Sequence, residues 1–382
     1  MVFILISHAV VVFDAFHLVD AIISALRYLV FLYILIAYCK HPRLNRYDVL
    51  WGLFVVYLLF TTVVKHGSIA NVIGPAIDFS LLLMMYHVFR NDMRDMLRAS
   101  TGALSFYIYL NLVLVILFPD GLWTDPISGR GYFLLGGNYN GIGARCVMAL
   151  VTNLLIFADS RAAKVNFACL TVASLATVIL VGSMTSTVCI LGLLAIWAFV
   201  QLKRHRLIVL SFFLVYMLAQ LIIVFTLSDL TNASHLVDFI EIVLHKDLTF
   251  TKRTDLWANS AELIAHSPWL GYGYQNKVWN EEHLNGPGSH NFVYTILLYG
   301  GYPLLCLFIG IVITALRKIL PLGKERQVSR LILGVNMFFF MMIFEYYTFF
   351  IIAFLITLLY YYHQYSPQLV KNNPTHANTL HT

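Results

Sequence analysis

Three residues in the hydrophilic parts of this 382-residue chain could do chemistry together. His290 ends a long hydrophilic segment and directly precedes an apolar run, and a histidine at such a position can act as a general base near neutral pH. Arg130 and Arg253 lie in hydrophilic segments as well, and a guanidinium group binds two phosphate oxygens at once. If an anionic substrate binds here, these arginines would hold it.

Each of these residues also has a structural explanation. His290 with Asn291 would cap the helix that follows, and the two arginines would be solvated or contact lipid headgroups. Arg145 differs, because it lies inside an apolar run, where a charge is costly unless it has a partner or a function. Extension of the side chain to the membrane surface is the alternative for Arg145, and it is the expectation for Arg27. Glu345 is a candidate partner for an arginine.

Several classes of site are absent from the sequence. It contains no H-E-x-x-H, no G-x-S-x-G and no P-loop motif. Gly271-x-Gly273 lacks the third glycine of a dinucleotide site, and no external pair of acids has D-x-D spacing. The five cysteines all lie in apolar runs, with no zinc-site spacing, and are expected to be small buried hydrophobic residues. The sequence therefore predicts neither a metal nor a cofactor.

The composition predicts a polytopic membrane protein. Hydrophobic residues make up 60% of the chain and charged residues 12%, whereas soluble domains have about 45–50% and about 25%. The apolar runs predict about twelve transmembrane helices in one all-α bundle, a single transmembrane domain over residues 1–382. The predicted spans are 2–13, 19–39, 48–64, 71–89, 99–118, 139–158, 165–182, 186–202, 207–227, 291–316, 331–346 and 347–363.

Lysine and arginine residues predict the orientation of the bundle. Seventeen of the 25 lie in one set of loops, and six lie in the opposite set. Because cytoplasmic loops carry the excess, both termini are expected in the cytoplasm. The net charge of +6 is then a topology signal, and no nucleic-acid partner is predicted. Residues 228–290 become a long external loop between the ninth and tenth spans, and residues 366–382 a disordered cytoplasmic tail.

The external loop has an internal pattern. Thr254 is predicted to cap a helix that starts at the next residue and ends before Pro268. The spacing places Trp257, Ala261 and Ile264 on one face of this helix. Gly271 and Gly273 then predict a bent backbone that approaches its surroundings closely.

Taken in order, these pieces resemble the O-antigen ligase/polymerase family. The similar segments are Arg253-Thr254-Asp255-Leu256-Trp257, Pro268-Trp269-Leu270-Gly271-Tyr272-Gly273, His290-Asn291 and Gly300-Gly301. Upstream, Arg130-Gly131-Tyr132-Phe133 with Asn138 and Asn140 resembles the region that precedes a span in that family. One departure is Met184, which follows Gly182-Ser183 where the family often has an arginine.

The resemblance implies a metal-independent, GT-C-like membrane glycosyltransferase at the outer face of the bacterial inner membrane. The implied partners are membrane lipids, an undecaprenyl-pyrophosphate-linked donor and acceptor, and a protein that regulates chain length. A polymerase joins repeat units, whereas a ligase transfers the polymer to lipid A-core; the short chain and compact loop favour a Wzy-type polymerase. A flippase or transporter is an alternative from another class, although no repeat of the kind common in transporters is visible.

The resemblance also implies roles for individual residues. Arg130 and Arg253 would hold the pyrophosphate, with Arg145 as a third candidate, and His290 would activate or orient the acceptor hydroxyl beside Asn291. Direct attack would invert the anomeric centre. The other candidate substrate-binding residues are Asn138, Asn140, Trp257, Tyr272, Tyr274, Gly271 and Gly273. For the aromatic residues among them, packing of the loop is the alternative to stacking on sugars.

Overall fold

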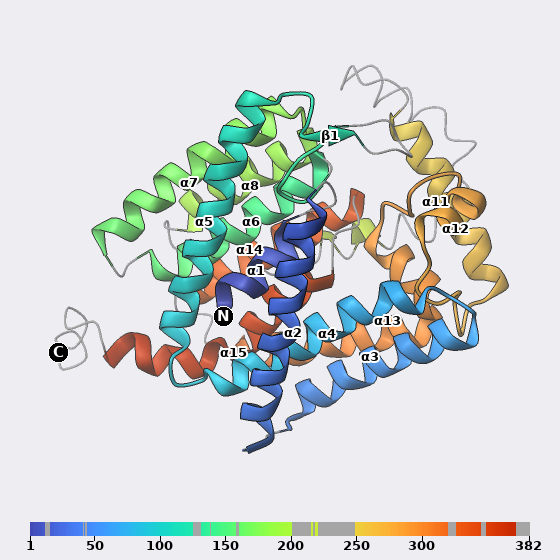
Figure 1. Cartoon of the computed structure of the whole chain (residues 1–382), viewed down its shortest axis with the longest axis horizontal. Coiled ribbons are helices and arrows are strands. Elements are labelled where there is room, and N and C mark those ends of the chain that lie inside the picture. The colour runs from blue at the N-terminus through green and yellow to red at the C-terminus, as the bar shows by residue number, and fades with distance from the viewer. Residues whose placement is uncertain are drawn as a thin grey trace.

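The computed structural model is a bundle of helices with one short hairpin (Figure 1). It describes residues 1–11, 16–40, 42, 44–124, 131–137, 139–157, 160–200, 215–216, 218–220, 249–319, 326–344 and 349–371. The helices are α1 (Val2–Val10), α2 (His17–Lys40), α3 (Arg46–Val64), α4 (Ile69–Val88), α5 (Met93–Leu117), α6 (Tyr139–Ile156), α7 (Arg161–Leu180), α8 (Met184–Val200), α11 (Thr249–His266), α12 (Lys277–Leu284), α13 (Phe292–Ile319), α14 (Arg326–Phe344) and α15 (Phe349–Lys371). The antiparallel hairpin pairs β1 (Trp123–Thr124) with β2 (Gly131–Tyr132).

Within the described ranges, six helices are long and apolar enough to cross a membrane, namely α2, α3, α4, α5, α7 and α13. Four more contain shorter apolar stretches: Gly141–Ile156, Met184–Ala195, Val328–Ile343 and Phe349–Tyr362. The chain is thus a polytopic helical membrane protein, and a total of about twelve crossings stays a prediction. The ninth predicted span, 207–227, falls mostly outside the described residues. The first is described as the nine-residue α1, which rises about 13 Å, less than half of a hydrocarbon core of about 30 Å.

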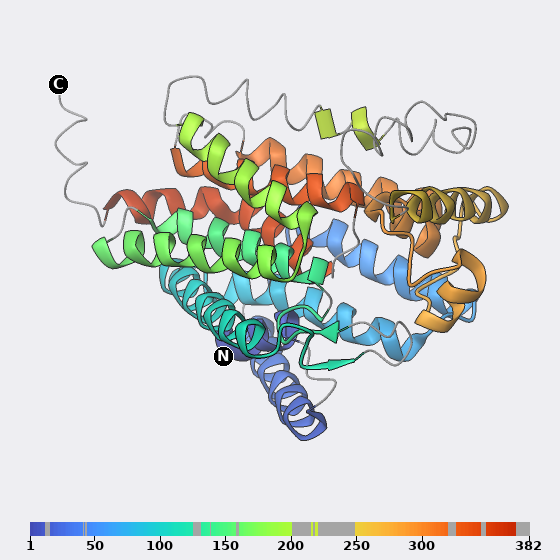
Figure 2. The same ribbon diagram turned by 90° about the horizontal axis from the view of Figure 1, so that it is seen from above.

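Three of the four shorter apolar stretches, those on α6, α14 and α15, form the centre of the bundle. Every described side chain of Gly141–Ile156 and of Phe349–Tyr362 is buried, and α14 packs against both α6 and α8. Helices that are apolar all round belong in such interior positions. The longer α2 is peripheral, because Arg27 and Ile34 are its buried residues, and Figure 2 shows it projecting from the rest.

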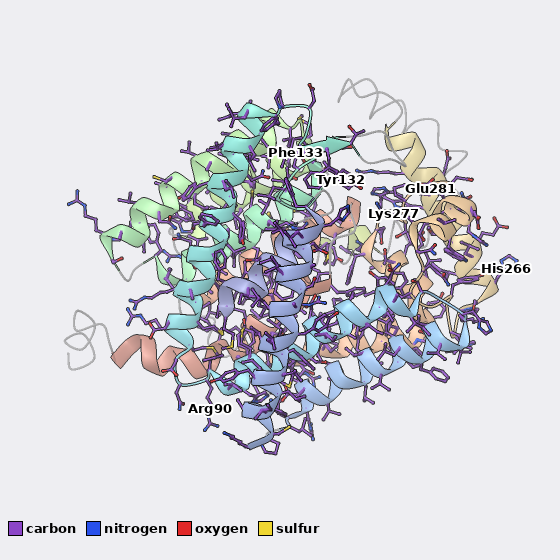
Figure 3. All side chains as sticks on the ribbon, in the orientation of Figure 1. Arg90, Tyr132, Phe133, His266, Lys277 and Glu281 are labelled. Atoms are coloured by element: carbon purple, nitrogen blue, oxygen red, sulfur yellow. The ribbon has the colours of Figure 1, made fainter. Side chains whose placement is uncertain are left out.

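The two ends of the bundle differ in charge. We call the end that carries Lys40, Arg90, Arg98, Arg161 and Arg317 the basic end. The opposite end carries α11, α12 and the loop between them, and we call residues 249–291 the cap and this end the cap end. Figure 3 shows Arg90 at the basic end, far from the cap residues Lys277 and His266.

One expectation for a charged residue was wrong. Arg27 does not extend to the surface: it is 4% exposed, and its Nη1 atom lies 3.4 Å from Oδ1 of Asp78 on α4. An arginine in an apolar setting needs such a partner, which sequence spacing alone did not reveal. At the other end of the chain α15 continues to Lys371, residues 372–382 lie outside the described part, and the disordered tail at 366–382 stays a prediction.

Candidate functional site

Helix α11 places Arg253 and Trp257 in the cap. The helix begins at Thr249, six residues before the predicted start, so Thr254 lies within it and does not cap it. It ends at His266, just before Pro268, as predicted. The Trp257 side chain is 2% exposed and packs into the apolar core. Packing, the alternative explanation, therefore accounts for Trp257, whereas Arg253 is partly exposed.

A docking turn, residues 267–275, fixes the cap onto helix α13. The backbone N–H groups of Tyr272 and Gly273 donate to the carbonyl oxygens of Leu298 and Tyr299 at 2.6 and 3.1 Å. These two carbonyl oxygens are available because the regular hydrogen-bond pattern of α13 is interrupted at Gly300 and Gly301, where the backbone angles are not helical. The segment that contains Gly271 therefore attaches the cap to α13.

Glycine is required on both sides of this junction. Gly271 has φ +59°, and a Cβ atom there would lie 2.5 Å from the Leu298 carbonyl oxygen. Gly301 has φ +62°, and a Cβ atom there would lie 2.2 Å from the Pro268 carbonyl oxygen. Both positions therefore exclude any side chain. Close approach of the backbone was predicted for Gly271, and contact of Gly271 with substrate stays a prediction.

The docking turn also binds the end of α3. Thr62 Oγ1 accepts a hydrogen bond from the Tyr274 backbone N–H at 2.9 Å, and the Tyr274 ring packs on Tyr299 with centroids 4.7 Å apart. The Tyr272 hydroxyl donates to the Leu263 carbonyl oxygen at 3.0 Å. Burial raises the pKa of Tyr272, so this phenol keeps its proton and remains a donor. Both tyrosines support the cap, and stacking of either on a sugar stays a prediction.

Asn291 is the N-cap of α13. Its Oδ1 accepts from the backbone N–H groups of Val293 and Tyr294 at 2.9 and 3.1 Å. Its Nδ2 donates to Gln220 Oε1 at 3.2 Å and to the Ile343 carbonyl oxygen at 3.1 Å. The side chain is fully buried, so contact with a substrate would require these bonds to break. Capping is the structural explanation predicted for Asn291, and the geometry favours it.

His290 is held between two buried residues. Its backbone has φ +47°, and its side chain is partly exposed, whereas Ser289 and Asn291 on either side are buried. The Ser289 hydroxyl donates to the Asn291 carbonyl oxygen at 2.9 Å and lies 2.7 Å from Thr295 Oγ1. These contacts fix the position of the His290 backbone where the cap meets the bundle.

A small cavity adjoins this junction. Its volume is about 50 Å³, enough for a few waters. Lining residues come from the docking turn, from α12 and from α13; they include Gly273, Trp279, Asn280, Ser289, Thr295 and Tyr299. Of the two glycines predicted to bind substrate, Gly271 and Gly273, Gly273 is the one that lines this cavity. In the described ranges no three His, Cys, Asp or Glu side chains gather as a metal site would require.

Arg145, on α6, is buried next to the turn that precedes this helix. It is 4% exposed, and its Nη1 donates to the Gly141 carbonyl oxygen at 2.9 Å. A Cβ atom on Gly136 would lie 2.9 Å from the same Nη1. Arg145 therefore does not extend to the membrane surface. Asn111 Oδ1 accepts from the Leu135 N–H at 2.9 Å and ties this turn to α5.

The cap contacts the β1–β2 hairpin through a residue that was not among the predicted site residues. Lys277 Nζ lies 3.4 Å from the Tyr132 hydroxyl and 5.5 Å from the centre of its ring (Figure 3). In the sequence, Lys277 stood out only as one of the six lysines and arginines in the less basic set of loops. Gln220, the partner of Asn291, was also missed; a lone amide inside the apolar run 207–227 could have revealed it.

Some predicted residues fall outside the described part of the chain. These are Arg130, Asn138 and Glu345, together with the side chain of Asn140. In the sequence Arg130 stands two positions before Tyr132. On the cap side, α11, which carries Arg253, packs against α13, which begins two positions after His290.

Comparison with known proteins identifies the region that contains this junction. A family model described as O-antigen ligase matches residues 169–309. This segment includes α8, the cap and the kink of α13. No curated protein and no solved structure matches the chain. Through the matched segment, the chain is similar to the O-antigen ligase family, in agreement with the resemblance found in the sequence.

Proposed function

We propose that this protein is a polymerase of surface polysaccharide, which joins repeat units carried on undecaprenyl pyrophosphate. The contact between Lys277 and Tyr132 carries the proposal, because it ties the β1–β2 loop to the cap. Arg130 belongs to that loop by sequence, and Arg253 and His290 belong to the cap. The similarity of residues 169–309 to O-antigen ligases, whose family transfers glycans, supports the reaction class.

The cations would stabilise the leaving group. As the glycosidic bond breaks, the pyrophosphate takes the bonding electron pair and its negative charge grows. Arg130 and Arg253 would bind this charge more strongly in the transition state than in the substrate, which lowers the barrier. Arg145 is a third candidate, and the exposed Lys277 is a fourth that the structure adds. No metal or other cofactor takes part in this mechanism.

His290 would act on the acceptor. It would take the proton from the attacking hydroxyl while the new bond to the anomeric carbon forms. Attack from the face opposite the leaving pyrophosphate inverts that carbon. The fixed backbone between Ser289 and Asn291 suits this role, because a general base must hold its distance to the proton that it removes.

The charge pattern supports an orientation for the reaction. The basic end would face the cytoplasm with both termini, and the cap would face the periplasm of a bacterial inner membrane. The lipid tails of donor and acceptor would lie against the bundle. A chain-length regulator is the expected protein partner.

A genetic experiment tests this function. The gene is deleted and restored with Arg253→Ala or His290→Ala, and the surface glycan is analysed by gel electrophoresis. We expect single-repeat products in the deletion strain and in both variants. The exposed His266, whose Nδ1 lies 2.8 Å from the Glu262 carbonyl oxygen, provides the matched control His266→Ala. Full-length glycan with both variants would contradict the site.

The description of the matching family favours a ligase as the second candidate. A ligase would transfer finished polymer to lipid A-core. In that case the deletion strain would accumulate long polymer on its lipid carrier, not single repeats. Accumulation of the lipid-linked unit on the cytoplasmic face would instead indicate a flippase.

A further inference from the structure

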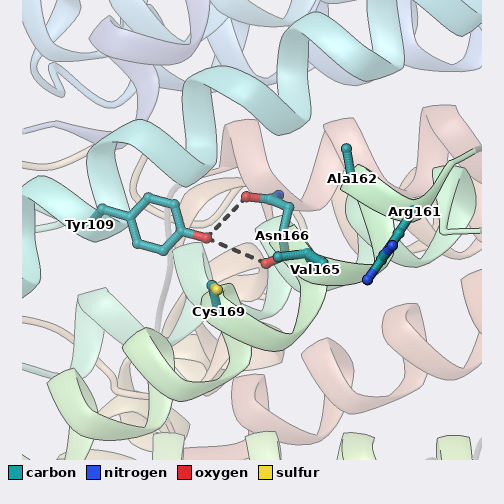
Figure 4. A pocket seen from close by; sticks show the side chains of 6 residues that line it. All are labelled: Tyr109, Arg161, Ala162, Val165, Asn166 and Cys169. Atoms are coloured by element: carbon teal, nitrogen blue, oxygen red, sulfur yellow. Dashed lines mark hydrogen bonds between the residues drawn. The ribbon is translucent and has the colours of Figure 1, made fainter.

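A groove runs between α5 and α7 near the basic end. It consists of two adjoining cavities of about 670 and 520 Å³. Both cavities include Tyr109, Ala162 and Asn166, so they form one continuous space. Figure 4 shows Tyr109 at one end of the first cavity and Arg161 at the other. The family match and the proposed reaction leave this groove unassigned, and it lies away from the cap.

The floor of the groove contains polar groups. The Tyr109 hydroxyl donates to Asn166 Oδ1 at 3.0 Å, and Asn166 Nδ2 donates to Ser105 Oγ at 3.0 Å. Asn153 on α6 lines the second cavity and is fully buried. Neither its Oδ1 nor its Nδ2 has a hydrogen-bond partner among the described residues. A buried amide without partners is costly, which indicates that a polar group from outside the chain binds here.

The mouth of the groove is basic. Arg161 lines the first cavity and Arg98 the second, and both are exposed. Asp95 lies 3.4 Å from Arg98 but is itself largely exposed, so it only partly screens that charge. The N-terminus of α7, which attracts anions, contributes Ser160, Ala162 and Ala163 to the same lining. This end of the groove therefore suits a negatively charged group.

The rim of the groove is apolar and faces outward. Phe106 is 51% exposed and Val165 is 55% exposed, on helices long and apolar enough to cross a membrane. Arg98 and Tyr109 are eleven positions apart on α5, which corresponds to about 16 Å along the helix. The groove thus offers charge at one end and an apolar channel of the length of an acyl chain segment.

We propose that this groove binds a phospholipid with an anionic headgroup. The phosphate lies between Arg98 and Arg161, a polar headgroup or ester oxygen reaches Asn153, and one acyl chain follows the apolar rim past Val165 and Tyr109. Basic pockets between transmembrane helices on the cytoplasmic side are typical sites for such lipids. The site stands apart from the proposed reaction, whose pyrophosphate would lie at the cap end.

Native mass spectrometry of the purified full-length protein tests the proposal. The probes are phosphatidylglycerol and phosphatidylcholine with identical acyl chains. The variant Arg98→Gln/Arg161→Gln removes both charges, and Arg317→Gln removes an exposed charge of the same end from another helix. We expect affinity for phosphatidylglycerol to fall about fivefold per arginine in the double variant and to stay unchanged in Arg317→Gln.

A second variant blocks the groove and keeps the charges. Gly102 lines the second cavity, and a Cβ atom there would have no neighbour within 4 Å. Gly102→Phe therefore has room, and its ring would occupy the groove and displace either lipid. Equal affinity of the unaltered protein for the two lipids would overturn the proposal, as would unchanged phosphatidylglycerol binding in the double variant or in Gly102→Phe.

Discussion

The two ends of α3 are attached to the rest of the molecule in different ways. At the basic end Asp48 accepts a hydrogen bond from the Tyr361 hydroxyl at 2.8 Å and lies 2.8 Å from His87 Nε2. Asn45, the N-cap of α3, donates to the same tyrosine at 3.0 Å. All of these contacts join side chains from α3, α4 and α15, and they depend on charge and on the identity of each residue.

At the cap end, the partner of each contacting α3 side chain is a main-chain group. Thr62 Oγ1 accepts from the Tyr274 N–H, and Thr61 Oγ1 donates to the Tyr299 carbonyl oxygen at 3.0 Å. The Tyr57 hydroxyl donates to the Trp269 carbonyl oxygen at 2.7 Å. The fit here depends on close approach at glycines, not on charge. The comparison shows two ways of holding a helix in place. At the basic end particular pairs of side chains attach α3, and at the cap end the backbones approach closely because glycines have no side chain.

The largest effect is expected from Gly301→Val. The new side chain meets the Pro268 carbonyl and needs a positive φ, so we expect a loss of about 4 kcal/mol from strain and overpacking. Thermal unfolding in detergent measures this loss. Gly310→Val on the same helix is the control, because a Cβ atom there would first meet Leu50 at 3.8 Å. Equal stability of the two variants would refute a steric basis for the cap junction.

Asp48→Ala tests the opposite end. Its carboxylate is buried, and its removal leaves the Asn45 N–H without an acceptor and leaves His87 and the Tyr361 hydroxyl bonded only to each other and to Asn45. We expect a loss of about 3 kcal/mol, as for one partner of a buried pair. Asp95→Ala is the control, because that carboxylate is exposed in its pair with Arg98. If both aspartates can be replaced without loss, charge does not hold the basic end together.

Tyr361→Phe separates the hydroxyl from the ring. The ring contacts with Tyr86 and Tyr47 remain, whereas the bonds to Asp48 and Asn45 are lost. The expected loss is about 1.5 kcal/mol, since hydrogen bonds to charged groups contribute about 1.5–3 kcal/mol. A melting temperature equal to that of the unaltered protein would assign the effect of Tyr361 to packing alone.

Thr62→Val is expected to have the smallest effect. It keeps the shape of the side chain and leaves the Tyr274 N–H without its acceptor, which costs about 1 kcal/mol. Protection of the Tyr274 amide against hydrogen exchange should fall, and protection of the Gly273 amide, bound to Tyr299, should stay. A loss as large as that of Asp48→Ala would mean that the cap end also depends on single side chains.

Much of the fold could be predicted because apolar runs specify membrane helices locally. The spans predicted at 48–64, 71–89 and 165–182 correspond to α3, α4 and α7 within a few residues. Contacts between distant segments could not be predicted in this way. The pairing of Arg27 with Asp78 follows from how α2 packs on α4, and no spacing in the sequence encodes it.

The candidate site was predictable to a similar degree. Sequence order was enough to select Arg253, His290 and the glycines, because the motifs are short and local. It could not separate capping from binding for Asn291, since the deciding partners, Gln220 and the Ile343 carbonyl, come from other helices. Lys277 was missed for the same reason, as Tyr132 lies 145 positions away.

The docking turn is attached through main-chain hydrogen bonds, and this affects how the sequence of the cap can change in evolution. Every residue except proline carries the same N–H and carbonyl groups, so the Tyr272 and Gly273 bonds to α13 do not depend on the outer surface of the cap. Trp269 and Val278, which are 68% and 58% exposed, can change without loosening that attachment. A new glycan preference could then arise through point substitutions on the cap, while the bundle that anchors it stays as it is.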